Sequence, residues 1–127
     1  MNSKIKRIID FSTAFGPSGM EDEVSSLAIE DAKDICEVHD DTMRNTYMHF
    51  KQDKEHETTI LLDAHADEVG FIVQALKPNG TIRFLPLGGW DPKNIVSGEV
   101  WILNDKGEKI SGIVASQPVH FLSEEKR

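Results

Sequence analysis

The first part of the chain carries apolar side chains at helical spacing. Between Ser3 and about Ala14 they recur every three or four positions, which predicts a short amphipathic helix. Ser3 precedes the periodic stretch and has a side-chain oxygen, so we expect it to cap this helix. The predicted apolar stripe consists of Ile5, Ile8, Ile9 and Phe11.

A break at residues 16–19, Gly-Pro-Ser-Gly, separates this helix from a second one. Ser18 and Glu21 have the three-residue spacing of a capping box, in which each side chain satisfies an amide at the start of a helix. We therefore expect a helix from about residue 19 to residue 34. Its predicted inward positions are Val24, Leu27, Ala28, Ala32 and Ile35.

Past Glu37 the spacing changes to that of strands. Residues 46–50 are a plausible strand, residues 51–57 a polar turn, and residues 58–64 a second strand. The second strand is apolar on both faces, which is typical of a strand covered on both sides. Helices followed by such a strand predict a three-layer α/β core. The apolar positions are Ile60, Leu61 and Leu62.

From Val69 onward the pattern is all-β. Residues 71–76 and 81–85 flank Pro78-Asn79-Gly80, a strong hairpin signal, and residues 100–103 and 109–114 flank a second turn. Short strands at this spacing are typical of a small barrel or sandwich. We predict a domain boundary near residue 70, with residues 70–127 forming an incomplete β-barrel.

Composition excludes several classes of partner. The 127 residues are 39% hydrophobic and 28% charged, as in globular domains, and the net charge of −8 disfavours nucleic acid and anionic membranes as main partners. Cys36 is the single cysteine, so no internal disulfide is expected. No apolar run approaches the roughly 20 residues that span a bilayer. A cytoplasmic protein is the default expectation.

The strongest candidate chemistry is His65 followed by Asp67 at the end of the apolar strand. Side chains two residues apart in an extended chain lie on the same side of the backbone, so the Asp67 carboxylate can orient the His65 imidazole. Zinc sites take three or four protein ligands, whereas this segment offers one imidazole and one supporting carboxylate. From the pattern alone, both a metal ligand and a structural histidine remain open. Four further histidines share no metal-binding spacing.

The chain resembles the first part of the glutamyl aminopeptidase family of cocatalytic metallopeptidases, whose members are often labelled endoglucanase M. Tetrahedral dodecameric aminopeptidases belong to that family. Four ordered stretches carry the resemblance: Phe15-Gly16-Pro17-Ser18-Gly19 with Glu21 to Val24, Leu62-Asp63-Ala64-His65-Ala66-Asp67-Glu68-Val69-Gly70-Phe71, Arg83-Phe84 to Gly88-Gly89-Trp90-Asp91, and Gly112-Ile113-Val114 to Pro118-Val119-His120.

The resemblance implies a metal-dependent aminopeptidase that acts on peptides through two divalent ions, zinc or cobalt. It implies an α/β peptidase domain with an inserted β-barrel used in dimerisation, and hence a homo-oligomer. It makes His65 a metal ligand and places Asp67 in the catalytic site as the residue that orients it. The family's other ligands and its general-base glutamate follow the inserted domain. We therefore expect residues 1–127 alone to bind no metal tightly and to be inactive.

Two further expectations accompany the resemblance. Family members tend to have glycine at the position of Arg44, and a positive φ there would cost an arginine about 1 kcal/mol or more. A different class of function also stays open: a non-catalytic binding or assembly module, or half of a split protein, that pairs through its open β edge.

Overall fold

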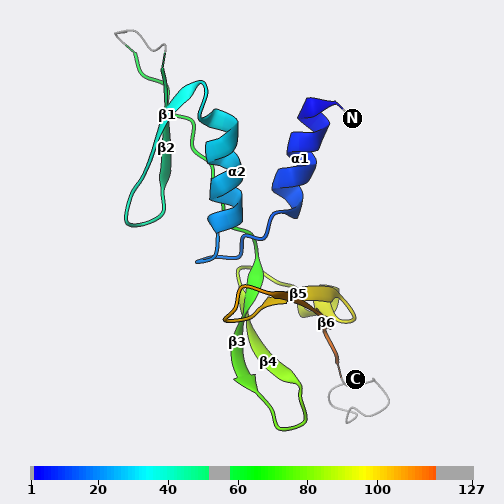
Figure 1. Cartoon of the computed structure of the whole chain (residues 1–127). Helices are drawn as coiled ribbons and strands as arrows, with labels where there is room; N and C mark the ends of the chain where they lie inside the picture. The colour runs from blue at the N-terminus through cyan, green and yellow to red at the C-terminus, as the bar shows by residue number, and fades with distance from the viewer. Residues whose placement is uncertain (1, 52–57, 117–127) are drawn as a thin grey trace. The chain divides into compact units, whose positions relative to one another are not determined.

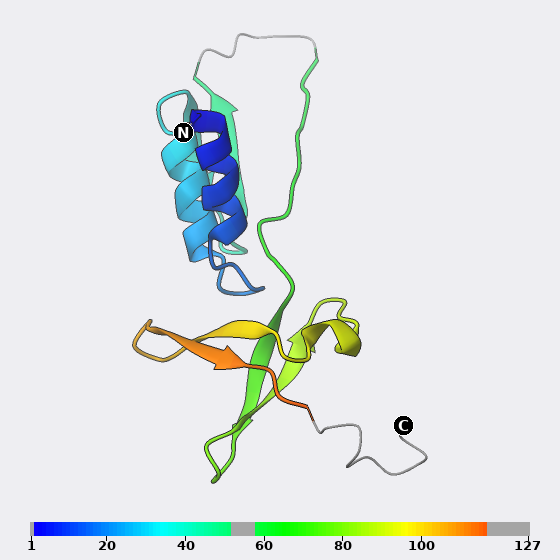
Figure 2. The same cartoon turned by 90° about the vertical axis from the view of Figure 1, so that its right-hand side faces the viewer.

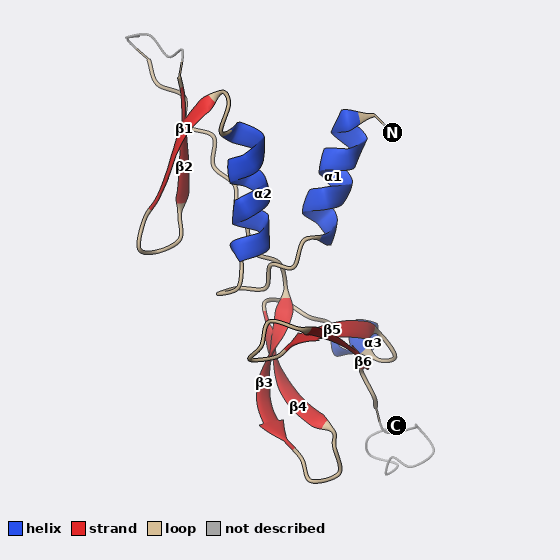
Figure 3. Ribbon diagram, in the orientation of Figure 1, coloured by secondary structure: helices blue, strands red, loops and turns tan. Residues whose placement is uncertain are grey.

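The computed structural model describes residues 2–51 and 58–116 of the chain (Figure 1). Within them the strands form three separate antiparallel pairs, drawn in red in Figure 3. The chain divides into two compact units, residues 1–88 and residues 89–127, which are described one at a time. The units divide after Gly88, and the predicted domain boundary near residue 70 stays a prediction.

The first helix, α1 (Ser3–Thr13), forms where the apolar spacing predicts it. Its cap is Asn2 and not Ser3, because Asn2 has the extended backbone of a capping residue and its side chain accepts a hydrogen bond from the Lys4 N–H at 2.9 Å. Ser3 already has helical geometry. The apolar stripe is correctly placed along the helix, but Ile5, Ile8 and Ile9 are exposed.

The second helix, α2 (Asp22–Ala32), is shorter than predicted at both ends. The capping box is wrong: Glu21 occupies the cap position without a side-chain cap bond. Its carboxylate instead accepts a hydrogen bond at 2.6 Å from the N–H of Gly19, which has φ +90°. This bond lowers the pKa of Glu21, and Arg44 adds to the effect. Of the predicted inward face, Ala32 is buried and Ile35, beyond the helix, is exposed.

A hairpin of β1 (Cys36–Asp40) and β2 (Thr46–Phe50) follows α2. The sequence predicts β2 but leaves β1 unassigned. Cys36, the first residue of β1, is buried. Asp41 organises the turn, since its Oδ1 accepts the N–H groups of Met43 at 2.8 Å and Asn45 at 2.9 Å. Hydrogen bonds from the Asn45 side chain and backbone lower the pKa of Asp41.

The predicted strand at residues 58–64 does not form. Residues 58–67 run as an extended segment without strand pairing (Figure 2). Ile60, Leu61 and Leu62 are 82%, 84% and 89% exposed. The reason is that a strand requires a neighbour for its backbone hydrogen bonds, and no described element pairs with this segment. Within the described ranges no sheet exceeds two strands, so the predicted three-layer arrangement is not seen there.

The first predicted hairpin of the β region is confirmed, with β3 (Gly70–Leu76) pairing antiparallel to β4 (Ile82–Leu87). Gly80 has φ +81° in the turn. Glycine adopts a positive φ easily, which is why an Asn-Gly pair favours a hairpin turn. The rings of Phe71 and Phe84 pack with centroids 4.5 Å apart. This local pairing follows directly from the sequence because the turn residues and both strands lie within a few positions of each other.

The second unit contains α3 (Pro92–Ile95) and the hairpin of β5 (Glu99–Leu103) and β6 (Lys109–Ile113). The hairpin is predicted, and α3, capped by Asp91, is not. Val114 is buried and exchanges backbone bonds with Ser97 and Gly98. The described strands of this region pair only two by two, so the predicted β-barrel stays a prediction. No described helix is long and apolar enough to cross a membrane.

Arg44 adopts φ 67°, which is the left-handed conformation. We considered a positive φ here because family members tend to have glycine at this position. Its guanidinium lies on the start of α2, 3.3 Å from a Glu21 carboxylate oxygen and 2.9 Å from an Asp22 oxygen. These contacts join the β1–β2 turn to α2. The arginine therefore combines a strained backbone with ion pairs that a glycine cannot make.

Two substitutions separate these effects. Arg44→Ala removes the ion pairs and keeps the strain, whereas Arg44→Gly removes both. We expect the Asn45 amide of the glycine variant to exchange about fivefold more slowly than that of the alanine variant, equivalent to about 1 kcal/mol in local opening. Amide hydrogen exchange measures this. Equal rates would show that the turn stores no strain at Arg44.

Candidate functional site

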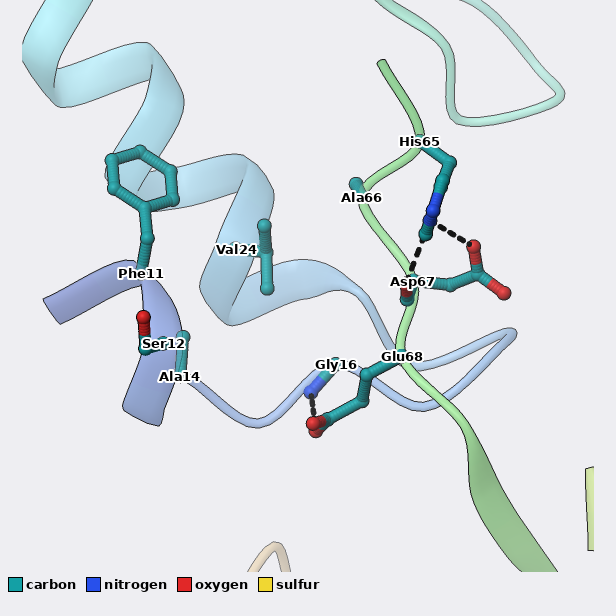
Figure 4. A pocket seen from close by; sticks show the side chains of 9 residues that line it. All are labelled: Phe11, Ser12, Ala14, Gly16, Val24, His65, Ala66, Asp67 and Glu68. Atoms are coloured by element: carbon teal, nitrogen blue, oxygen red, sulfur yellow. Dashed lines mark hydrogen bonds and ion pairs between the residues drawn. The ribbon is translucent and has the colours of Figure 1, made fainter. Parts of the chain in front are cut away.

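His65 and Asp67 lie in contact in the extended segment that precedes β3. The His65 Nδ1 is 2.9 Å from the Asp67 backbone oxygen and 3.1 Å from its carboxylate Oδ1 (Figure 4). A backbone carbonyl only accepts hydrogen bonds, so Nδ1 is the donor, and in the neutral imidazole Nε2 then carries the lone pair. The His65 side chain is 85% exposed. Its Nε2 can thus bind a cation or accept a proton.

A loop between the two helices holds this segment in place. The Glu68 N–H donates to the Gly16 oxygen at 2.8 Å, and the Gly16 N–H donates to Glu68 Oε1 at 3.1 Å. Pro17 and Glu68 also form an isolated parallel bridge. Gly16 and Glu68, 52 positions apart, are therefore joined through both backbone and side chain. These bonds hold the segment that contains His65 and Asp67, which pairs with no described strand.

Two glycines allow this close approach. A Cβ on Gly16 would lie 2.7 Å from Val24 Cγ2, and a Cβ on Gly70 would lie 2.8 Å from Pro17 Cβ. Both distances are shorter than any normal carbon contact, so a side chain at either glycine would push the loop away. Gly16, Glu68 and Gly70 are structural parts of the site that sequence reasoning did not assign. Their presence in the stretches that carry the family resemblance was the available signal.

A recess of about 320 Å³ opens beside the segment. Its wall combines side chains of α1, the loop and α2 with the segment itself, as Figure 4 shows. A second recess, of about 220 Å³, is lined partly by the start of β3 and the end of β4. Three residues line both recesses: His65, Asp67 and Glu68.

Among the described residues the candidate metal ligands do not gather into a complete set. Residues 2–51 and 58–116 contain no group of three or more histidine, cysteine, aspartate or glutamate side chains arranged to hold an ion. His39 and His49 stack on the β1–β2 hairpin with ring centroids 5.5 Å apart. His56 and His120 lie outside the described residues. An imidazole is a good ligand for zinc or cobalt, so His65 fits one position of such a site.

Comparison with known proteins connects this geometry to a family. Residues 45–127 match the model of the M42 glutamyl aminopeptidases. The glutamyl aminopeptidase of Lactococcus lactis is 44% identical over 69 residues, which are 54% of this chain and 19% of that protein. The lysyl aminopeptidase of Pyrococcus furiosus is 30% identical over 124 residues, 96% of this chain and 34% of that one.

Solved structures agree. A TET aminopeptidase from a marine sediment archaeon of the Thaumarchaeota superposes with a TM-score of 0.88 at 32% identity, over 98% of this chain and 35% of that chain. The TET1 peptidase of Pyrococcus horikoshii gives a TM-score of 0.80 at 28% identity, over 96% and 36% of the two chains. The chain thus spans about a fifth to a third of these relatives, and its backbone follows the matched part of their structures. It belongs to the M42 glutamyl aminopeptidase family.

Proposed function

We propose that this chain contributes the N-terminal portion of a metal-dependent aminopeptidase, which removes N-terminal residues from peptides by two-metal hydrolysis. The observation that carries the proposal is the contact of His65 Nδ1 with both oxygens of Asp67 that face it. This contact leaves Nε2 free in a chain whose relatives are named aminopeptidases. His65 is then a metal ligand, and Asp67 holds its tautomer and direction.

The chain's own residues supply only part of the chemistry. A pair of zinc or cobalt ions would supply Lewis-acid chemistry for peptide hydrolysis when bound, and His65 would be one of the residues that hold them. His65 supplies one ligand, and the described residues hold no set of three. The remaining ligands and a base to move the proton of the water must come from elsewhere. Residues 1–127 alone are therefore inactive in this proposal.

The all-β region has an assembly role in the same proposal. The hairpins β3–β4 and β5–β6 belong to part of an inserted barrel used in dimerisation, and the protein forms a homo-oligomer. Support comes from the Pyrococcus horikoshii peptidase, which assembles into a tetrahedron or a large octahedral shell. The alternative of a non-catalytic module is not favoured, because the relatives named above are all called aminopeptidases or peptidases.

A chimera tests the role of His65. The third of the Pyrococcus furiosus lysyl aminopeptidase that matches this chain is replaced by residues 1–127. We expect metal-dependent hydrolysis of an aminoacyl p-nitroanilide. His65→Ala should reduce kcat/KM at least ~100-fold, since a ligand is lost, and Asp67→Asn about 10–100-fold, as for other residues that orient metal ligands.

His39→Ala is the matched control, since His39 lies on the β1–β2 hairpin and is not a lining residue of either recess. This variant should keep the activity of the parent chimera. A folded, active chimera in which His65→Ala performs as well as His39→Ala would contradict the ligand role.

Calorimetry on the isolated chain tests the second part of the proposal. Titration with zinc or cobalt should show no tight uptake of two ions per chain, because a single imidazole lacks the charge and the partner ligands that hold an ion. Peptide hydrolysis should likewise be undetectable. Binding of two ions at submicromolar affinity, lost in the His65→Ala variant, would show that the chain is self-sufficient.

A further inference from the structure

The peptide group that joins Asp67 to Glu68 is hydrogen-bonded at both of its ends. Its N–H, from Glu68, donates to the Gly16 oxygen at 2.8 Å. Its carbonyl, from Asp67, accepts from His65 Nδ1 at 2.9 Å. Because a peptide group is planar and rigid, the two ends cannot turn independently. The direction of the carbonyl that holds His65 therefore depends on the anchor at Gly16.

The Glu68 side chain adds a second bond to the same anchor. Its Oε1 accepts the Gly16 N–H at 3.1 Å, in a partly buried position (Figure 4). One hydrogen bond lets two segments pivot about it, whereas two bonds between the same residues fix their relative orientation. Gly16 itself is buried.

The anchor is held in turn by α2. The Phe15 N–H donates to a Glu23 carboxylate oxygen at 2.9 Å. Gly16 also lies so near Val24 of the same helix that no room remains for a Cβ between them. A continuous set of contacts thus runs from the first turn of α2 through Gly16 and Glu68 to the imidazole of His65.

We propose that Glu68 is a positioning residue for His65: by clamping Gly16 it fixes the Asp67–Glu68 peptide group and so keeps the proton of His65 on Nδ1 and its Nε2 open. The proposal gives Glu68 a role separate from metal binding and from proton transfer. It rests on the proposed function only in that the open Nε2 is the ligand atom.

Nitrogen NMR of the histidine rings in the full 127-residue chain tests the proposal without metal or catalysis. Glu68→Ala should shift the His65 tautomer from Nδ1–H toward Nε2–H and speed exchange of the Gly16 amide about 5–10-fold, the effect of one lost hydrogen bond. Glu68→Gln keeps a side-chain oxygen that can accept the Gly16 N–H. It should therefore stay within about twofold of the parent chain.

A second pair of variants reaches the anchor without changing Glu68. Gly16→Ala should produce the same tautomer shift, because its Cβ would lie 2.7 Å from Val24 Cγ2 and displace the loop. Gly89→Ala is the matched control, since a Cβ on Gly89 meets nothing within 4 Å. In all variants the β3–β4 amides should keep their protection, which separates positioning from general unfolding.

Each outcome of these experiments decides one specific claim. An unchanged His65 tautomer and Gly16 exchange rate in Glu68→Ala would overturn the positioning role, whatever His65 binds. A Glu68→Gln variant that behaves like Glu68→Ala would also overturn it, because the charge and not the hydrogen bond would then matter. If the His65 tautomer responds to the Glu68 variants as expected but His65→Ala leaves the chimera active, the assignment of His65 as a metal ligand is wrong. The positioning role of Glu68 is then still supported.

Discussion

The pair of hydrogen bonds between Gly16 and Glu68 is the interaction on which the site depends. His65 lies in a segment that pairs with no strand of the described chain, so its backbone has no ladder to hold it. The loop between α1 and α2 provides the missing support. A candidate catalytic imidazole is therefore oriented by a turn far away in the sequence, and the two glycines at that contact matter because they leave room for it.

The accuracy of the sequence predictions follows the range of the interactions involved. The hairpin at Asn79-Gly80 is confirmed because its turn and both strands are local. The mutual orientation of His65 and Asp67 agrees with the spacing along an extended chain. The capping box fails because a competing acceptor role for Glu21, toward Gly19, lies within the same few residues. Contacts across 52 residues, such as Gly16 with Glu68, leave no local pattern.

The segment containing Ile60, Leu61 and Leu62 shows the limit of a hydrophobic pattern. Apolar side chains on both faces indicate an environment in which a segment is stable, namely one covered on both sides. The pattern does not say which element provides the cover. Here the described residues provide none, and all three side chains are more than four-fifths exposed. Whether a strand forms thus depends on the segments that pair with it as much as on its own residues. For this reason the sequence pattern does not predict β1 and predicts a strand at residues 58–64 that does not form.

Asp67 and Glu68 divide the control of His65 between side chain and backbone. Asp67 offers two acceptors to Nδ1, its carboxylate at 3.1 Å and its backbone oxygen at 2.9 Å. A change of the Asp67 side chain leaves the backbone acceptor in place, so the imidazole keeps one of its two partners. Loss of the Glu68 side-chain bond leaves the backbone bond from the Glu68 N–H to the Gly16 oxygen, and the peptide group can then pivot about that single bond. The tautomer of His65 should therefore depend on Glu68, which does not touch the imidazole, as well as on the Asp67 side chain, which does.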